Sequence, residues 1–431
     1  MKIIVSTLGK FQLFKSFGIY MGSALFNAAI PFLMLPVFTR YLSLEDYGII
    51  SMFTILSGFF MPFIGLSSSG ILSREYFTNN KENFSEYVGN IFFILLISLI
   101  PIVIIVYLFQ PDIASLAKVP VNFIYMVLIF SFFSFLLNTF LIIIQNESKA
   151  RLYGFFQIGQ TVLNVSLSLA FVVLMGKGWE GRICAQIIAI MVFGILSFYF
   201  LVRSHRVLFV FRKQYFFDSL KFGIPLIPHT LGAIVISMSD RFFIAKMVDI
   251  ETTGLYALAF SIASIIGFIE HSFNLAFAPW LFEKLGLNSY SIKRKIVLFT
   301  YLYFFIILAF VFILTFSSPI IFDIFIDKKF EGSQVFVFWI ALSFAFSGMY
   351  KMVTNYIFYV KKTYILAWVT FGSAGINIVL NYFLIKEYGA VGAAISSAIV
   401  SFFFFVFTWI ISYNVYQMPW NLKLLTKSQI R

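Results

Sequence analysis

A lysine is predicted to lie deep inside a membrane-spanning helix, where a charge needs a reason. Lys351 precedes Lys361 by about ten residues, or roughly 15 Å of helix, so it falls near the middle of a span. Ser347 and Asn355, one turn before and after it, complete a polar face. Because a charge at the bilayer centre is costly, Lys351 either binds an anionic ligand there or extends its side chain to the cytoplasmic surface.

Two acids and a histidine inside predicted spans are candidates for ion coupling. Glu270 and His271 are neighbours in the eighth predicted span, but adjacent helical residues point about 100° apart, so they do not form one site on their own helix. Burial favours the neutral form of a carboxyl, which makes Glu270 a candidate proton carrier. The alternative is an acid paired with a cation from another helix. Asp240 lies in the seventh predicted span, whose start Pro225 and Pro228 should distort, as in the broken helices of transporters.

Three further cations are expected near the outer ends of helices. Arg241 either contacts an anionic substrate, anchors its helix at the interface, or forms an ion pair that closes an outer gate. Arg40 and Lys246 end the first helix of each half of the chain. They either bind substrate or tie the outer turn to nearby acids, Glu45 or Asp46 in the first half and Glu251 in the second.

Two amides lie on polar helix faces, and catalytic motifs are missing. Asn164 and Asn377 either line a hydrated cavity suited to sugar hydroxyls or form hydrogen bonds between helices. The sequence has no P-loop, no Ser/His/Asp set, three histidines and one cysteine, Cys184. We therefore expect no catalytic residues, no metal site and no cofactor, and a protein that is not an enzyme.

The elements that position these residues are predicted membrane helices. Hydrophobic residues make up 61% of the chain and charged residues 11%, against roughly 25% charged in soluble domains. Apolar blocks longer than about 18 residues predict an all-α polytopic membrane protein. The twelve expected helices cover 14–39, 47–71, 86–109, 121–144, 152–175, 180–202, 221–245, 254–278, 295–317, 333–359, 363–385 and 389–415.

The net charge of +13 is explained by topology and not by nucleic acid. Lys and Arg sit between apolar blocks, and more than twice as many fall on the side of both termini as on the other. The positive-inside rule then places both termini in the cytoplasm. Membrane lipids are the expected surroundings, and no nucleic-acid partner is expected.

The chain repeats itself weakly, in the same order in both halves. "TRYLSLEDYGI" at 39–49 aligns with "AKMVDIETTGL" at 245–255, and "GKGWEGRICAQ" at 176–186 with "KEYGAVGAAIS" at 386–396. Two six-helix lobes of equal orientation follow, related by an axis along the membrane normal. In alternating-access transporters of this kind the substrate site lies between the halves.

This repeat divides the chain into three parts. The expected domains are an N-terminal lobe at 1–202, a cytoplasmic linker at 203–220 and a C-terminal lobe at 221–431. The linker is the longest connection, and no loop reaches the roughly 50 residues of a soluble domain.

Three segments resemble a known family. "PFLMLPVFTRYLSLEDYGI" at 31–49, residues 223–259 with the Ser-Asp-Arg-Phe run at 239–242, and "YGAVGAAIS" at 388–396 resemble the polysaccharide (O-antigen) flippases. These belong to the multidrug/oligosaccharidyl-lipid/polysaccharide exporter superfamily, which has a MATE-like fold. The resemblance implies a V-shaped pair of lobes and export of an undecaprenyl-diphosphate-linked oligosaccharide to the periplasmic leaflet, in lipopolysaccharide biosynthesis. Polysaccharide polymerase and chain-length machinery are the partners that it implies.

Other activities remain open from the sequence. A diphosphate suits a cationic cavity, for which Lys351, Arg241, Arg40 and Lys246 are the candidates, with H⁺ or Na⁺ as the coupling ion. The alternative is an ion-coupled antiporter of small drugs, or a flippase of another lipid-linked precursor, on the same fold. A glycosyl polymerase is expected to need a longer outer loop than this chain has.

Overall fold

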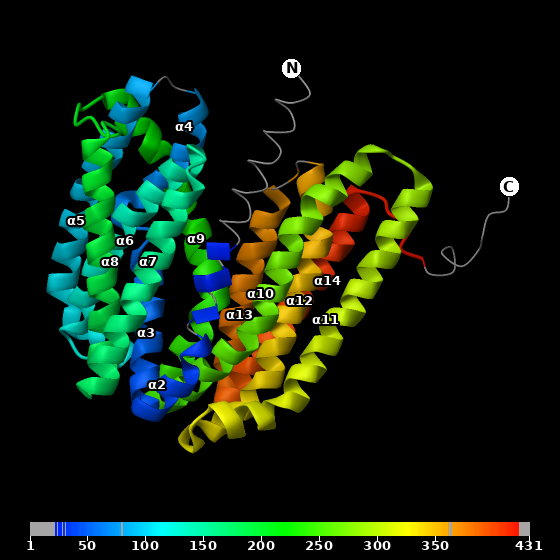
Figure 1. Ribbon diagram of the computed structural model, residues 1–431. Helices are drawn as coiled ribbons and strands as arrows, with labels where there is room; N and C mark the ends of the chain where they lie inside the picture. Colours follow the sequence, from blue (N-terminus) through cyan, green and yellow to red (C-terminus); the bar gives the residue numbers. More distant parts are fainter. Residues whose placement is uncertain are drawn as a thin grey trace. The chain divides into compact units, whose positions relative to one another are not determined.

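The described part of the chain is built from helices and the turns between them. The computed structural model describes residues 32–78, 81–360, 362 and 364–421, together with 22–23, 25–27 and 29–30 (Figure 1). Ten of its helices are long and apolar enough to cross a membrane. A bent pair, Leu44–Phe60 with Ile64–Phe77, meets the same test across a 64° bend and would be the eleventh. The all-α multi-pass fold is thereby confirmed, while much of the first predicted span, 14–39, lies outside the described residues.

The chain forms two compact units, and the first ends at Ile234. Within unit 1, α6 and α7 pack against α8, and α3 packs against α6. The elements of this unit are α2 (Leu35–Tyr41), α3 (Leu44–Phe60), the 3-10 segment η1 (Ile64–Ile71), α4 (Leu72–Thr78), α5 (Lys81–Ala117), α6 (Phe123–Asn146), α7 (Ala150–Ser168), the π-helical η2 (Leu169–Leu174) and α8 (Gly178–Arg203).

Unit 2 starts at Val235 and repeats the packing of unit 1. Here α12 and α13 pack against α14, and α10 packs against α12, so corresponding helices are paired in the same way in both halves. After the shared helix α9 (Lys213–Met247), the elements are α10 (Ile250–Gly286), α11 (Tyr290–Phe325), the 3-10 segment η3 (Lys328–Ser333), α12 (Gln334–Tyr359), α13 (Tyr364–Tyr388) and α14 (Ala390–Val415).

The connection between α8 and α9 lies along α5. The backbone N–H of Leu208 donates to the Ser85 carbonyl at 3.0 Å. The Asn90 amide donates to the Val210 carbonyl at 2.9 Å and accepts from the backbone N–H of Arg212 at 3.0 Å. The boundary between the two compact units along the chain lies within α9, between Ile234 and Val235, downstream of the predicted linker at 203–220.

Capping residues explain where helices α3 and α10 begin. Ser43 and Asp46 form a reciprocal capping box at the start of α3, with each side chain accepting from the other residue's backbone N–H. Asp249 caps α10 by accepting from the backbone N–H of Thr252 at 2.6 Å. Both caps fall in the aligned segments of the sequence repeat, so the repeat extends to how these helices start.

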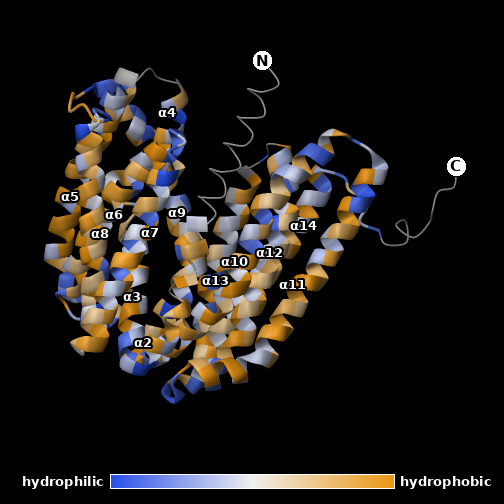
Figure 2. Ribbon diagram, viewed as in Figure 1, coloured by the Kyte–Doolittle hydropathy of each residue, from blue (hydrophilic) through white to orange (hydrophobic). Residues whose placement is uncertain are grey.

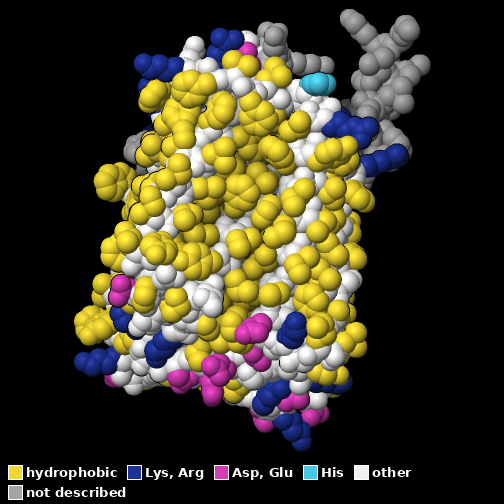
Figure 3. All heavy atoms as spheres, turned by 90° about the vertical axis from the view of Figure 1, so that its left-hand side faces the viewer, with side chains coloured by type: hydrophobic (Ala, Val, Ile, Leu, Met, Phe, Trp, Pro, Cys, Tyr) yellow, Lys and Arg dark blue, Asp and Glu magenta, His cyan; other side chains and the backbone are white. Residues whose placement is uncertain are grey.

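The outer surfaces of the helices are apolar. In each unit the hydrophilic residues gather toward the helix ends (Figure 2). A wide hydrophobic belt covers the face drawn in Figure 3, with Lys, Arg, Asp and Glu at its two ends. Along α5 the exposed side chains include Leu96, Ile100, Ile104 and Leu108. Such a belt fits the hydrocarbon layer of a bilayer.

Candidate functional site

The polar core of unit 2 contains an ion pair inside two membrane helices. Lys351 on α12 places its Nζ 2.6 Å from Oε1 of Glu270 on α10. The Glu270 side chain is 4% exposed and that of Lys351 is 28% exposed, so the carboxylate is buried and the ammonium can be reached. The predicted anion-binding cation and the predicted proton carrier are therefore one pair. The expectation that Glu270 pairs with a cation from another helix is confirmed.

A glycine allows α10 and α12 to approach at this pair. A Cβ built on Gly348 would lie 2.9 Å from the Glu270 Cβ and 2.7 Å from the Tyr303 hydroxyl. Real Cβ atoms do not approach other heavy atoms this closely, so Gly348 makes room for the carboxyl. Tyr303 stacks on Phe273 with 4.4 Å between ring centroids, which closes that side of the pair with aromatic surface.

One turn further along both helices, a second contact continues the polar face. The Asn355 side-chain amide donates to the side-chain oxygen Oδ1 of Asn274 at 2.9 Å. Glu270 Oε2, in contrast, is buried without a hydrogen-bond partner among the described residues. A buried carboxylate oxygen left unpaired is costly, and it can be satisfied by a proton, a cation or a ligand donor. The pair is therefore chemically incomplete on the side of Glu270.

A second acid, Asp240, is held in a cage of neutral donors near the end of α9. Asp240 is 3% exposed. Its Oδ2 accepts from the hydroxyls of Tyr256 at 2.8 Å and Ser397 at 2.6 Å. Its Oδ1 accepts from the Asn381 amide at 3.1 Å. These donors come from α10, α14 and α13, so one carboxylate joins four helices of unit 2.

The predicted amide Asn377 belongs to the same cage. Its Oδ1 accepts from Ser239 Oγ at 2.5 Å and from the Asn381 amide at 3.0 Å. Asn381 Oδ1 is buried and has no partner among the described residues. The cage thus gathers carboxylate, amide and hydroxyl oxygens, which are the ligands that hard cations prefer. It can hold a proton or a small cation.

The neighbouring cation, Arg241, packs against an aromatic ring. Arg241 is 6% exposed, and its guanidinium carbon lies 3.8 Å from the centroid of the Phe260 ring, a cation–π contact. Nε of Arg241 has no hydrogen-bond partner among the described residues. Arg241 lies near the end of α9, which ends at Met247, and its roles in substrate binding, anchoring or gating stay predictions.

In unit 1 the predicted amide Asn164 binds a cation. Asn164 on α7 accepts from Nη1 of Arg182 at 2.7 Å, and Ser168 Oγ lies 2.9 Å from the same nitrogen. The Arg182 guanidinium carbon lies 5.3 Å from the centroid of the Phe38 ring. The ion pairs of the described residues do not include Arg182, so its charge is shared only with neutral groups. Ser168 ends α7, directly before the π-helical segment, a feature frequent at functional sites.

The remaining predicted residues lie outside these clusters. Arg40, Lys246 and His271 are exposed, whereas Glu270, the neighbour of His271 on α10, is buried. Asp46, one expected partner of Arg40, instead caps α3 and accepts from the backbone N–H of Trp179 at 2.9 Å.

Sequence reasoning missed Arg182, Tyr256 and Ser397 as members of the polar clusters. Arg182 lies about one turn inside α8, which starts at Gly178, and also inside the predicted helix 180–202. Its position one turn into an apolar helix was the available signal. A tyrosine or serine in an apolar helix carries no comparable signal, because each is common there.

Comparisons with known proteins identify the family. Residues 13–285 match the model of the family described as "Polysaccharide biosynthesis protein", and the chain belongs to this family. Residues 225–383 also match the MatE family. An "Uncharacterized membrane protein" of Haemophilus influenzae is 29% identical over 82% of this chain and 85% of its own length.

Solved structures share the fold. An inward-facing multidrug resistance MATE family transporter of the MOP superfamily superposes with a TM-score of 0.71 at 16% identity, covering 94% of this chain and 96% of that one. Lipid II flippase MurJ, in an inward closed conformation, gives 0.69 at 18% identity, covering 93% and 87%. These identities establish the fold alone. The predicted MATE-like fold is confirmed.

Proposed function

We propose that this protein is a flippase that moves an undecaprenyl-diphosphate-linked oligosaccharide from the cytoplasmic to the periplasmic leaflet by alternating access. Membership of the polysaccharide biosynthesis family supports the glycan, and the flippase fold of one structural neighbour supports the lipid. The observation that carries the proposal is the ion pair of Lys351 with Glu270 inside two membrane helices. Burying a charged pair inside membrane helices costs free energy, so we expect the pair to have a function.

The head group of the substrate binds by replacing Glu270 as the partner of Lys351. A diphosphate offers several anionic oxygens, each a strong acceptor from an ammonium. Lys351 is reachable, and its Nζ carries three N–H groups, so it can donate to phosphate as it leaves Glu270. In unit 1, Arg182 offers a second cation that no acid neutralises among the described residues. Arg40 and Lys246 are exposed and are further candidate phosphate contacts.

Release of Glu270 from Lys351 links the substrate to an ion. Without its cation, the buried carboxyl of Glu270 has neither oxygen paired and takes up a proton. The Asp240 cage is the second coupling site, where Na⁺ or H⁺ would compete with the hydroxyl and amide donors. Asn164 and Asn377 then have a supporting role, because each holds a charged cluster and is not free for sugar hydroxyls. His271 is exposed and could pass protons toward Glu270.

The experiment is translocation of a fluorescent undecaprenyl-diphosphate-linked oligosaccharide in proteoliposomes, run with Lys351→Arg and the pair Lys351→Met/Glu270→Gln. The double substitution removes both charges together, so no buried ion is left alone. We expect Lys351→Arg to retain activity and the double variant to lose it. Lys295→Gln, which removes an exposed lysine from α11, is the control. Full activity of a well-folded double variant would disprove the role of the pair.

A drug-export function makes a different prediction in the same vesicles. An exporter of small cations would accumulate ethidium under an ion gradient and would not require Lys351. Ethidium transport without lipid translocation would replace the present proposal by that function.

A further inference from the structure

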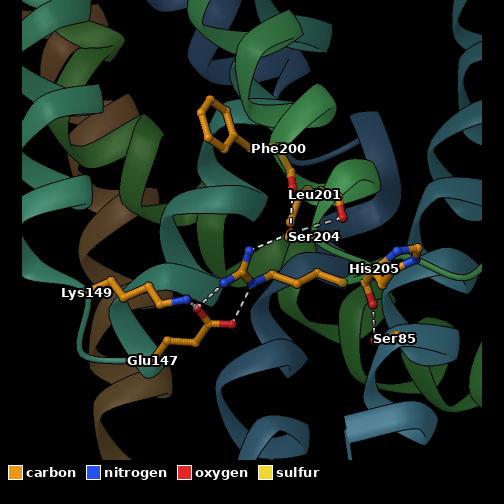
Figure 4. Close-up of polar contacts among 8 residues, drawn as sticks. Ser85, Glu147, Lys149, Phe200, Leu201, Ser204 and His205 are labelled. Carbon is orange, nitrogen blue, oxygen red and sulfur yellow. Dashed lines mark hydrogen bonds and ion pairs between the residues drawn. The ribbon is translucent and has the colours of Figure 1, made fainter.

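A pocket of about 540 Å³ opens at one end of unit 1, away from the polar clusters described above. It forms where three connections come together: the end of α4 with the start of α5, the turn between α6 and α7, and the segment after α8 (Figure 4). The residues that line it are Tyr76, Phe84, Ser85, Glu147, Lys149, Ser204, His205 and Arg206. The mechanism proposed for the flippase uses none of them.

Two cations in this pocket share one carboxylate. Arg206 binds Glu147 through both Nε, at 2.6 Å, and Nη2, at 2.7 Å. Lys149 Nζ lies 2.7 Å from the same carboxylate, and its side chain is 47% exposed. One positive charge is left over. Because an ammonium has three N–H donors, Lys149 keeps donors for a ligand, and Figure 4 shows its side chain reaching toward Glu147.

Hydrogen bonds and aromatic packing hold the wall of the pocket in place. The Ser85 hydroxyl donates to the His205 carbonyl at 3.0 Å, and the Leu208 N–H donates back to Ser85. His205 has a φ of +52°, in the left-handed region that non-glycine residues adopt at some cost. Tyr76 packs edge-on against Phe84 at 5.3 Å. The cations are therefore held in place before any ligand arrives.

Apolar side chains are exposed beside this charged pocket. Phe77, next to the lining residue Tyr76, is 74% exposed, and Phe200 and Val202 near the end of α8 are 38% and 42% exposed. A charged pocket bordered by apolar surface at the end of membrane helices suits a ligand with an anionic head and acyl chains. We propose that this pocket binds the phosphodiester head group of an anionic membrane phospholipid. Lys149 is the principal hydrogen-bond donor to the phosphate, and Glu147 limits the affinity for the lipid.

Lipid binding to the full-length protein in neutral detergent tests this assignment. The probes are dioctanoyl phosphatidylglycerol, dioctanoyl phosphatidylcholine and inorganic phosphate, with occupancy followed by native mass spectrometry. We expect phosphatidylglycerol to bind more tightly than either of the others. Equal binding of phosphatidylcholine would overturn the anionic head group. Equal binding of inorganic phosphate would show a phosphate site that does not recognise lipid, and would also overturn the proposal.

Two substitutions of opposite expected effect identify the pocket. Lys149→Gln should weaken phosphatidylglycerol binding about fivefold, the contribution of one basic residue near an anionic surface. Glu147→Gln should leave binding unchanged or strengthen it, because it removes the competing carboxylate and frees Arg206. Lys295→Gln, an exposed lysine of unit 2, is the matched control and should have no effect. A purely structural ion pair would instead lower the melting temperature in both pocket variants without changing the lipid affinity.

Discussion

Lys351 and Glu270 are 81 positions apart in the chain, yet their side chains meet at 2.6 Å between two membrane helices. Each residue alone suggests a separate role: Lys351 as a hydrogen-bond donor to phosphate, and Glu270 as a proton carrier. Their contact makes the two roles mutually exclusive in time, because an ammonium bound to phosphate no longer neutralises the acid. This exchange is the simplest physical link between substrate binding and ion uptake in this chain.

Removing Lys351 alone should damage folding as well as transport. Lys351→Ala leaves Glu270 buried with neither oxygen paired, and we expect a loss of roughly 2–3 kcal/mol of stability, the lower range for breaking a buried pair because Lys351 is partly exposed. Adding Glu270→Gln should restore the melting temperature but not lipid translocation. Thermal unfolding in detergent and the vesicle assay measure the two effects. Restored transport in the double variant would contradict the exchange mechanism.

Gly348 sets the approach of the helices that carry the pair. In Gly348→Ala the new methyl group would contact the Glu270 Cβ and the Tyr303 hydroxyl, so α10 and α12 must separate. We expect a loss of about 1–3 kcal/mol and reduced translocation. Gly372→Ala on α13 is the matched control, because no atom lies within 4 Å of its added Cβ. It should be neutral or stabilise the helix by roughly 0.5–1 kcal/mol. Equal melting temperatures for the two variants would show that the close approach is unimportant.

Asp240 should determine the ion dependence of transport. Asp240→Asn removes the charge but also turns an amide N–H₂ toward donors such as Ser397 and Tyr256, so we expect loss of the response to a Na⁺ or H⁺ gradient and a moderate fall in stability. Transport measured with each gradient in turn identifies the ion. Asp323→Asn, at an exposed acid of α11, should keep the gradient response. An unaltered response in Asp240→Asn would remove the cage from the coupling mechanism.

Glu147 should make unit 1 sensitive to acid. Partial burial works to raise the pKa of Glu147, but hydrogen bonds from Arg206 and Lys149 outweigh it and hold that pKa below its ordinary value of 4.5. A lowered pKa gives stability that is present at neutral pH and lost as the pH falls through the folded-state value. The difference in melting temperature between the native protein and Glu147→Gln should therefore be largest near neutral pH and shrink below about pH 4.5. A difference that does not change with pH would argue against the ionised pair.

Membrane sidedness can be tested from the two ends of unit 1. In a Cys184→Ser background, a cysteine at position 118 should react with an impermeant maleimide in intact cells. A cysteine at position 213 should react only after the membrane is opened, because the excess of Lys and Arg predicts that this end is cytoplasmic. Lys118 and Lys213 are both exposed, so access by itself does not distinguish them. The reverse labelling pattern would invert the topology.

Much of this architecture was predictable from the sequence, because membrane helices are long and every backbone polar group must be satisfied within them. The predicted polar helix faces did include Asn164 and Asn377, and both form hydrogen bonds between helices. What could not be predicted was the partner of each charge, since helix pairs with small residues such as Gly348 can approach in many registers. Arg241 shows the same limit: the sequence placed it near a helix end, and only the structure shows that its guanidinium packs on the Phe260 ring.

Helix α9 has a consequence for how the gene can be recombined. The sequence repeat restarts at the beginning of this helix, but its first part, up to Ile234, is packed with unit 1 and only the remainder belongs to unit 2. Chimaeras with relatives that are joined in the connection after α8 would place a foreign helix segment against the native unit 1. A chimaera of two family members that keeps the packing of each unit intact therefore requires a crossover between Ile234 and Val235. This point lies inside a transmembrane helix and not in a loop, where crossovers are usually chosen.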